Sequence, residues 1–351
     1  MSAGRPLLVT GGAGFIGSNL ADRLARDGRD VIVYDAMLRS GVEANARWLA
    51  DRHPDRIRIT QADLRDTDRL KAAVAEAGAV FHLAAQVAVT TSLVDPVEDF
   101  QVNLASTFAL LEAARAEATP VPVIFASTNK VYGDLADVEL EADAERWSPV
   151  DPGIARSGVD ENRPLDFHTP YGCSKGAADQ YVLDYGRSYG VPSCVFRMSC
   201  IYGPRQMGNE EQGWVAHFLR EAIARRPITL FGDGKQVRDV MHVDNAVAAY
   251  VSALSRIEGI KGRAFNLGGG RANAVSLRQV IDEIGRLVGQ APEIRFDGWR
   301  QGDQRWFVAD ARRARLALDL PQPMDWRQGL ADLHRWLGSL DADAGRVEVA
   351  A

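Results

Sequence analysis

The sequence contains few cysteines and no long hydrophobic run. Its 351 residues include only Cys173, Cys194 and Cys200, whose spacing matches neither metal ligands nor a disulfide framework. No apolar stretch approaches the roughly 20 residues that a helix needs to cross a membrane. No charged leader precedes an apolar core at the N-terminus. We therefore expect a cytoplasmic protein without a metal site.

Positive charge is also scarce. The chain has 41 Lys and Arg against 47 Asp and Glu, which gives a formal net charge of −6 at pH 7. Neither nucleic acid nor an acidic membrane surface is therefore an expected partner. Lysine occurs only at positions 71, 130, 175, 235 and 261, so a lysine near a candidate site is notable. The length allows one large α/β domain or two smaller ones that share an interface.

The stretch Leu7–Gly17 is the most informative part of the chain. An apolar run leads into Gly11, Gly14 and Gly17, and an amphipathic helical pattern follows. This order of strand, tight turn and helix is typical of dinucleotide binding, because glycines let the backbone approach a pyrophosphate at the helix N-terminus. The intervening Phe15 and Ile16 are expected at the cofactor as well.

Further cofactor contacts are predicted where later strands end. Asp35 ends the second predicted strand, where a carboxylate accepts hydrogen bonds from the adenosine ribose and favours NAD over NADP. Asp63 is a candidate contact for the adenine amino group, and Asn103 is expected to tie backbone segments together near the site. His82, inside an apolar strand, is interpreted as a core histidine. The other cofactor-binding candidates are Arg39, Leu64, Ala84, Ala85, Gln86 and Ser127.

Strands and helices alternate with short connections through most of the first 200 residues. This alternation predicts a doubly wound parallel sheet of the α/β class. Ligands of such sheets lie beyond the carboxyl ends of the strands, which is where these candidate residues fall. A long helix is expected over 96–116. The segment 133–170, rich in acids, proline and glycine, is expected to be a long ordered loop with a function.

Tyr171 and Lys175 lie four residues apart on a predicted helix, so their side chains share one face. A phenol titrates near pH 10, and a nearby ammonium favours its ionised form. Tyr171 is therefore a candidate general base for a hydroxyl proton during hydride transfer. Thr128, at the end of the fifth predicted strand, can hydrogen-bond the same hydroxyl. We predict that these three residues are catalytic and that Tyr171 and Lys175 also contact the cofactor.

Four segments together resemble the extended short-chain dehydrogenases/reductases that modify nucleotide sugars: 11–17, 82–86, 171–175 and 238–244. The resemblance spans about residues 7–340. It implies a Rossmann domain with a non-dissociating NAD and a nucleotide sugar held between that domain and a smaller mixed α/β lobe. The division expected is 1–200 with 236–268 for the NAD-binding domain, 201–235 with 269–340 for the substrate lobe, and 341–351 as a disordered tail.

The residues that follow Thr128 indicate the type of reaction. The 4,6-dehydratases of this family carry an Asp–Glu pair there as acid and base for water elimination, and decarboxylating relatives use a Glu. This chain has Asn129 and Lys130 instead, so redox-neutral epimerisation is favoured. A further resemblance, to the CDP-paratose 2-epimerase group, implies inversion at carbon 2 of a CDP-linked deoxyhexose. Its motifs are Ser127–Gly133, Leu165–Lys175, Gln212–Val215 and Gly302–Asp310.

Three alternatives remain open at this stage. The same residues suit a UDP-hexose 4-epimerase with the sugar docked differently. They also suit a nucleotide-sugar dehydrogenase or reductase that releases its cofactor in each turnover. A third alternative is a catalytically inactive member that only binds a nucleotide. Which base carries the sugar, and which carbon is inverted, is not decided by these residues.

Substrate contacts are predicted from side-chain chemistry. A guanidinium fork matches phosphate oxygens, so Arg238 and Arg305, each beside an acid, are candidates to bind a diphosphate. Ion pairs with Asp239 or Asp303 are the alternative. Trp214 is a candidate to stack on the pyrimidine or to fill a core. The resemblance further implies a homodimer or homotetramer through the helices at 100–116 and 175–189. The weaker substrate-binding candidates are Thr90, Asn129, Ser199 and Arg205.

Overall fold

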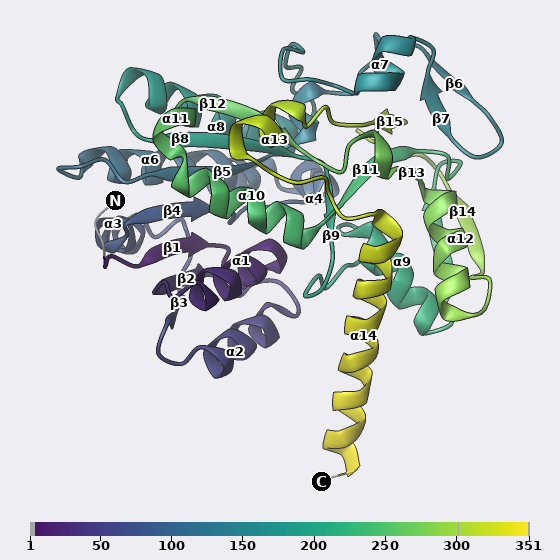
Figure 1. Cartoon of the computed structure of the whole chain (residues 1–351), viewed down its shortest axis with the longest axis horizontal. Helices are drawn as coiled ribbons and strands as arrows, with labels where there is room; N and C mark the ends of the chain where they lie inside the picture. The colour runs from purple at the N-terminus through teal and green to yellow at the C-terminus, as the bar shows by residue number, and fades with distance from the viewer. Residues whose placement is uncertain (1–3, 301, 350–351) are drawn as a thin grey trace.

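A parallel seven-stranded sheet forms the centre of the protein (Figure 1). The computed structural model describes residues 4–300 and 302–349, with side chains described up to residue 340. The strand order is β12-β8-β5-β4-β1-β2-β3, and every neighbouring pair is parallel. The predicted doubly wound parallel fold is therefore confirmed. The strands are β1 (Leu7–Thr10), β2 (Val31–Asp35), β3 (Ile57–Gln61), β4 (Ala79–His82), β5 (Val123–Thr128), β8 (Ser193–Met198) and β12 (Arg263–Leu267).

Helices cover both faces of this sheet, because alternate side chains of a strand point to opposite sides. Leu7 and Val9 pack against α1, α2 and α10 on one face, whereas Leu8 packs against α3, α6 and α8 on the other (Figure 1). Strands buried on both faces read as continuous apolar runs, as these do. The helices are α1 (Phe15–Arg26), α2 (Val42–Arg52), α3 (Thr67–Glu76), α6 (Ser106–Ala116), α8 (Thr169–Ser188) and α10 (Val243–Ser255).

The helix predicted over 96–116 is not a single regular helix. It consists of α5 (Pro96–Phe100), a π-helical turn over Gln101–Ala105, and α6. A π-helical turn holds one more residue than an α-helical turn and occurs frequently at functional sites. Asn103 lies in this turn and is buried. A short helix, α4 (Val89–Val94), precedes α5.

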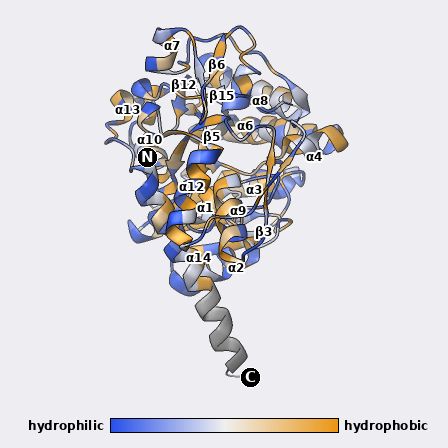
Figure 2. Ribbon diagram, turned by 90° about the vertical axis from the view of Figure 1, so that its right-hand side faces the viewer, coloured by the Kyte–Doolittle hydropathy of each residue, from blue (hydrophilic) through white to orange (hydrophobic). Residues whose placement is uncertain are grey.

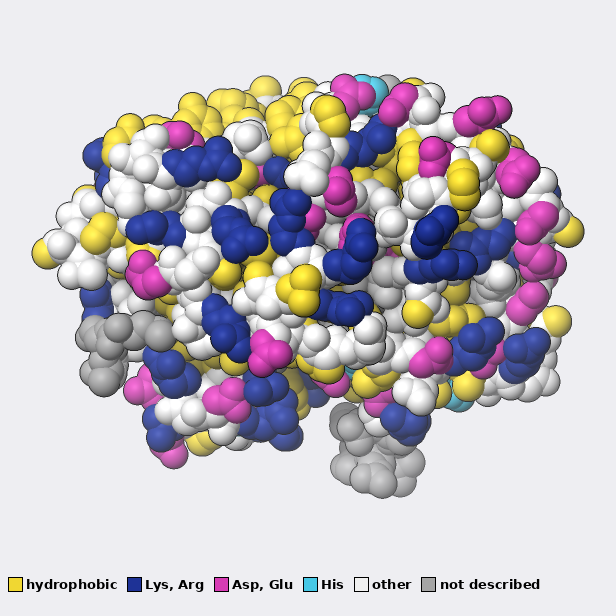
Figure 3. Space-filling model, turned by 45° about the horizontal axis from the view of Figure 1, so that its top comes forward, with side chains coloured by type: hydrophobic (Ala, Val, Ile, Leu, Met, Phe, Trp, Pro, Cys, Tyr) yellow, Lys and Arg dark blue, Asp and Glu magenta, His cyan; other side chains and the backbone are white. Residues whose placement is uncertain are grey.

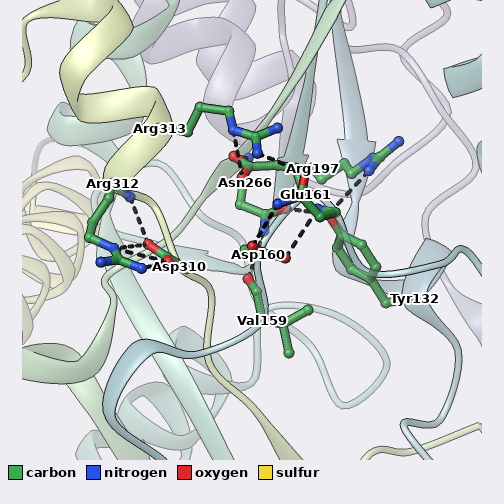
Figure 4. A network of polar contacts seen from close by, with 10 residues as sticks. Tyr132, Val159, Asp160, Glu161, Arg197, Asn266, Asp310, Arg312 and Arg313 are labelled. Atoms are coloured by element: carbon green, nitrogen blue, oxygen red, sulfur yellow. Dashed lines mark hydrogen bonds and ion pairs between the residues drawn. The ribbon is translucent and has the colours of Figure 1, made fainter. Parts of the chain in front are cut away.

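The segment 133–170, predicted as a long loop, contains regular structure. A 3₁₀ turn over Asn129–Tyr132 leads into the hairpin β6 (Leu140–Ala142) and β7 (Trp147–Pro149), and α7 (Pro152–Ser157) follows. The main sheet anchors this segment (Figure 4). The Asn266 side-chain amide donates to the Val159 carbonyl and its backbone N–H donates to Glu161, both at 2.8 Å. These bonds to β12 fix the middle of the expected loop.

The smaller lobe is built on a second sheet. Its strand β11 (Val237–His242) pairs with β9 (Cys200–Tyr202), β13 (Ala274–Ser276) and β15 (Trp306–Phe307). β11 falls within 236–268, the segment predicted for the NAD-binding domain, but its hydrogen-bonded partners are these strands rather than the main sheet. The chain returns to the main domain with α10. A parallel pair, β10 (Ile228–Phe231) and β14 (Ile294–Asp297), forms a separate small sheet.

The lobe has its own hydrophobic core, in which α9, α12 and α14 pack together. Figure 2 shows hydrophobic ribbon concentrated around α1, α9 and α12 in the middle of the molecule. α14 continues as helix through most of 341–351, where the sequence predicted a disordered tail; residues 350 and 351 lie outside the described residues. The remaining elements are α9 (Trp214–Ile223), α11 (Ile257–Ile260), a 3₁₀ turn (Arg271–Asn273), α12 (Leu277–Val288), α13 (Arg312–Leu318) and α14 (Trp326–Val349).

Candidate active site

The glycine turn between β1 and α1 has the shape that a pyrophosphate requires. Gly11 has φ +67°, and a Cβ added there would lie 2.7 Å from the backbone nitrogen of Ala84. A Cβ on Gly17 would lie 2.1 Å from the Gly11 carbonyl oxygen. Gly14 caps α1 without a side-chain hydrogen bond, so the first N–H groups of the helix remain available to an anion. Phe15 and Ile16 form the first turn of α1.

Asp35 lies beside this turn, as the sequence predicted. Its carboxylate oxygens accept hydrogen bonds from the backbone N–H groups of Ala13, at 3.1 Å, and Met37, at 2.9 Å. Burial raises its pKa, and these bonds and the Arg39 guanidinium act in the opposite direction. Each carboxylate oxygen keeps a further lone pair, which a ribose hydroxyl can use. The residues around the turn therefore suit NAD.

The next strand end is less open. The Asp63 carboxylate is held by the Arg65 guanidinium at 2.7 Å, and this bond lowers the pKa of Asp63. Leu64 is buried in the core beneath α3. The contact of Asp63 with adenine stays a prediction, and it requires a group that shares the carboxylate with Arg65.

Asn103 joins the exit of β4 to the helix α8. Its side-chain oxygen accepts from the Gln86 N–H and its amide donates to the Gln86 carbonyl, both at 3.0 Å. The same amide lies 3.3 Å from the Ser174 hydroxyl. The predicted tying role of Asn103 is confirmed. Ala84 and Ala85 lead into Gln86, whose buried Oε1 has no hydrogen-bond partner among the described residues and is available to a ligand.

His82 is a neutral core residue, as predicted. Its ring nitrogens lie 2.7 Å from the Thr10 hydroxyl and 2.9 Å from the Thr107 hydroxyl. Burial lowers its pKa to about 3. Both nitrogens are thus engaged, and the ring does not charge at neutral pH.

β5 and α8 bring two of the predicted catalytic side chains into contact. Thr128 is the last residue of β5, Tyr171 lies in the first turn of α8, and both are buried. Burial raises the pKa of Tyr171 to about 12, and the hydrogen bond with the Thr128 side chain lowers it only in part. In the protein alone, Tyr171 is therefore a neutral phenol beside the Thr128 side chain.

Lys175 lies one turn after Tyr171 and is 3% exposed. Its ammonium stands 4.0 Å from the centre of the Phe125 ring. Burial lowers its pKa to about 7, against the opposing charges of Asp179 and Asp99. We expected this ammonium to lower the pKa of Tyr171; the protein alone shows the opposite direction, because desolvation outweighs the other effects on the phenol.

A buried ion pair anchors α8, the helix that carries Tyr171 and Lys175. Asp179, on α8, accepts from the Ser127 hydroxyl at 2.8 Å and from Arg197 at 2.9 Å. Arg197 also donates to the Tyr132 hydroxyl at 3.2 Å, which in turn donates to Asn266 at 2.7 Å (Figure 4). The Ser127 hydroxyl, predicted to contact the cofactor, thus donates a hydrogen bond to Asp179. The network links the strand that carries Thr128 to the 133–170 segment.

The lobe supplies Arg238 to the same region. Its guanidinium donates to Asp303 and to the Gln304 carbonyl, both at 2.6 Å, and its side chain is 8% exposed. The Asn129 amide donates to Gln304 Oε1 at 3.0 Å, and Lys130 donates to the Gly302 carbonyl at 2.7 Å. Residues 302–304 therefore accept hydrogen bonds from the end of β5 and from β11. The Asn129 amide, predicted to contact substrate, is hydrogen-bonded to Gln304.

Other substrate candidates are distributed more widely. Arg305 is exposed, with its guanidinium between Trp147, at 4.9 Å, and Trp299, at 5.4 Å from the ring centres. Arg205 lies 3.3 Å from the centre of the Trp48 ring on α2. In the structure, Arg205 and Arg305 thus pack on aromatic rings, whereas Arg238 bonds to Asp303 and Gln304.

Three candidates remain near the second sheet or its loops. The Trp214 indole N–H lies 3.4 Å from Cys200 Sγ, and Ser199 donates to the buried Asp239. Thr90, on α4, donates to Glu211, while Arg39 donates to the neighbouring Gln212. The loop that contains Glu211 and Gln212 therefore contacts both the β2–α2 connection and α4.

Two side chains of this region were missed from the sequence. Gln304 joins Asn129 to the lobe and also donates to the Gly133 carbonyl; its signal was its place in the Gly302–Asp310 motif. Arg300 lies 3.6 Å from the centre of the Phe231 ring and donates to the Glu210 carbonyl at 2.8 Å. Its position shortly before Gly302 was the only hint in the sequence. Arg300 is the second arginine, after Arg39, whose guanidinium lies beside the loop that contains Glu211.

Comparison with known proteins places this geometry in a family. Residues 7–268 match the NAD dependent epimerase/dehydratase family. The chain belongs to this family. It is 39% identical to the CDP-paratose 2-epimerase of Salmonella typhi over 95% of this chain and 99% of that protein. It is 35% identical to the UDP-glucose 4-epimerase of Mycolicibacterium smegmatis, over 92% of this chain and 96% of that protein.

A solved member of the family has the same fold. The UDP-glucose 4-epimerase of Thermus thermophilus, determined in complex with NAD, superposes with a TM-score of 0.78 and 30% identity. The match covers 94% of this chain and 98% of that one. NAD as the cofactor, predicted from the glycine turn and Asp35, is confirmed by the family.

None of the helices in the described part of the chain is long and apolar enough to span a membrane. Within the same residues, no group of three or more His, Cys, Asp or Glu side chains is arranged to hold a metal ion. Figure 3 shows Lys and Arg side chains spread over one face and interspersed with Asp, Glu and hydrophobic residues.

Proposed function

We propose that this protein is a nucleotide-sugar epimerase that inverts carbon 2 of a CDP-linked hexose, with a deoxyhexose as the favoured substrate. The observation that carries the proposal is the 39% identity, over nearly the full length of both chains, to a CDP-paratose 2-epimerase. The UDP-glucose 4-epimerase of Mycolicibacterium smegmatis is less similar, at 35% identity.

The residues at the end of β5 support an epimerase over a dehydratase. Thr128 is followed by Asn129, whose amide is bonded to Gln304, and by Lys130, whose ammonium is bonded to Gly302. Asn129 has no ionisable group, so the pair cannot supply both the acid and the base that elimination of water needs. With NAD bound, oxidation and reduction at a single carbon require acid–base groups only at the sugar hydroxyl, where Thr128 and Tyr171 are placed.

In this proposal, Tyr171 is the group that exchanges the hydroxyl proton. The sugar hydroxyl binds beside Thr128 and Tyr171. Thr128 orients it, and Tyr171, after losing its own proton to solvent in the filled site, takes the hydroxyl proton as a phenolate. Lys175, partly charged near neutral pH because its pKa is about 7, stabilises the phenolate once the site is filled. The chemistry supplied by bound NAD is reversible two-electron oxidation of the sugar carbon. The keto-sugar then rotates within the site, so that it is reduced from its opposite face while Tyr171 returns the proton. No net redox change results.

NAD would be held by the glycine turn, Asp35 and the residues after β4. The N–H groups at the start of α1 would bind the pyrophosphate, and Asp35 would bind the adenosine ribose. Arg39, Asp63, Ala84, Ala85 and Gln86 are proposed to complete the contacts. Arg238 is proposed to bind the substrate diphosphate, with Trp214 near the base.

Oligomerisation is a separate proposal. Helices α6 and α8 expose large apolar side chains on adjacent surfaces, among them Phe108 and Tyr181, whose rings meet edge to face at 5.5 Å. Tyr189 follows α8 and is 50% exposed. Contiguous exposed apolar surface of this kind is typical of protein–protein interfaces. We propose a homodimer through these helices, to be tested by light scattering of the wild type and a Phe108→Glu variant.

The function is tested by product analysis. The purified protein would be incubated in D₂O, without added NAD, with CDP-paratose, CDP-glucose and UDP-glucose in separate reactions, and the products followed by NMR. Inversion at carbon 2 of a CDP sugar without deuterium at that carbon is the expected result. Inversion at carbon 4 of UDP-glucose would favour the 4-epimerase, and stoichiometric NADH release would favour a dehydrogenase. Deuterium at the inverted carbon would contradict the oxidation mechanism.

A further inference from the structure

Lys130 connects the reacting end of the site to the lobe. It lies in the 3₁₀ turn that follows β5, and its backbone N–H donates to the Thr128 hydroxyl at 3.2 Å. Its ammonium donates to the Gly302 carbonyl at 2.7 Å. An ammonium has three N–H bonds, and this is its one hydrogen bond to a described residue. Two of its three donors therefore remain for a ligand, and the side chain is only partly buried.

A second cation lies beside it. Lys130 bonds to Gly302, while Arg238 bonds to Asp303 and Gln304, so three consecutive residues receive both side chains. Burial and then the Arg238 charge lower the pKa of Lys130 to about 8. Asp303, Cys200 and Asp134 act in the opposite direction. Asp303 is already in an ion pair with Arg238, which leaves surplus positive charge where these two cations meet.

The geometry of a nucleotide sugar explains why a cation would stand so near Thr128. Carbon 2 is adjacent to carbon 1, which carries the phosphate, whereas carbon 4 lies across the ring. A site that oxidises carbon 2 must therefore hold the sugar-linked phosphate close to the Thr128–Tyr171 pair. Of the two cations, Lys130 is the one whose own backbone is hydrogen-bonded to Thr128.

We propose that Lys130 binds the sugar-linked phosphate of the nucleotide diphosphate and so places carbon 2 at Thr128 and Tyr171. The proposal rests on the proposed function. Lys130 is a positioning residue for that carbon, and Arg238 shares the diphosphate. A bound anion favours the charged ammonium, so binding near pH 8 should be accompanied by proton uptake.

The test uses CDP and CMP, which differ by the phosphate that Lys130 would bind. Affinities would be measured by titration calorimetry for the wild type and for Lys130→Gln, which keeps a hydrogen-bond donor but lacks the charge. CDP binding should weaken about 10- to 100-fold, the range of a charged hydrogen bond, and CMP binding should change less than about twofold. Lys130→Arg should retain most of the CDP affinity. Lys71→Met, at an exposed position of α3, is the matched control.

Proton linkage separates this role from a structural one. At pH 8, wild-type CDP binding measured in two buffers of different ionisation enthalpy should show proton uptake, and the Lys130→Gln variant should show none. Equal weakening of CDP and CMP, or unchanged proton uptake in the variant, would overturn the proposal. A wild type that binds CDP with the expected Lys130 dependence but inverts no sugar would overturn the proposed function alone. A wild type that binds only UDP and UMP would reject CDP as the carrier, and the same comparison would then be made with that pair.

Discussion

Lys175 is predicted to lower the stability of the fold in return for its role at the site. Its ammonium is 3% exposed, and burial lowers its pKa from 10.5 to about 7. A shift of this size corresponds to about 5 kcal/mol at 1.36 kcal/mol per pH unit. The Phe125 ring, 4.0 Å from the ammonium, returns about 2 kcal/mol when the contact is desolvated. We expect Lys175→Met to raise the free energy of unfolding by about 3 kcal/mol at pH 6.

The pH dependence distinguishes this effect from better packing of methionine. Below the folded pKa of about 7, the lysine is charged in both states and the full penalty applies. Between that value and 10.5, the folded protein releases the proton while the unfolded chain keeps it, so the penalty shrinks as the pH rises. The two pH units between the folded pKa of about 7 and pH 9 correspond to about 2.7 kcal/mol, so the advantage of Lys175→Met should fall by about that amount between pH 6 and pH 9.

The assay is urea denaturation, followed by circular dichroism at both pH values, in protein freed of NAD. The control is Lys71→Met, whose exposed position on α3 predicts a change within about 0.5 kcal/mol at either pH. Lys175→Met should also lose epimerase activity. A variant that is less stable at pH 6, or a gain that is the same at both pH values, would refute the reasoning.

Three further predictions follow from the site. Tyr171→Phe should lower kcat by about 10²- to 10⁴-fold while NAD stays bound; full activity would contradict the mechanism. Gly17→Ala should abolish NAD binding, measured by cofactor absorbance after purification, because the new Cβ would lie 2.1 Å from the Gly11 carbonyl oxygen; retained NAD would show that the turn can relax. Asp179→Asn should cost about 3–5 kcal/mol of unfolding free energy by leaving a buried guanidinium unpaired, whereas Asp27→Asn, in an exposed pair, should cost less than about 1 kcal/mol.

Much of the fold could be predicted because its signals are local. The apolar runs that became β1, β4 and β5, and the helical pattern after Tyr171, each reflect the period of one element. The predicted bounds of these elements agree with the structure to within a few residues. The glycine turn is recognisable from the sequence because its backbone conformation and close contacts require glycine. Prediction was weaker over 133–170, which contains short strands and α7, and where Val159 and Glu161 are held by hydrogen bonds to Asn266 of β12 rather than by a sequence pattern of their own.

The candidate site divides in the same way. Thr128, Tyr171 and Lys175 follow from the end of one strand and the spacing along one helix. Arg305 and Arg205 were selected by chemistry and position in motifs, and tertiary packing engages both with aromatic rings instead. The effect of Lys175 on the pKa of Tyr171 was predicted from charge alone. In the folded protein desolvation has the greater influence on that pKa, and only the depth of burial decides this.

The sequence by itself determined the parallel sheet and the dinucleotide turn, and it selected the candidate catalytic side chains, since each depends on residues close together in the chain. Only the tertiary structure decided which cations meet. Lys130 and Gly302 are 172 positions apart, and Asn129 and Gln304 are 175 apart. No periodicity within one element encodes such pairs, because they form only when the lobe packs on the end of β5. The surplus positive charge beside Thr128 is therefore a property of the assembled domains.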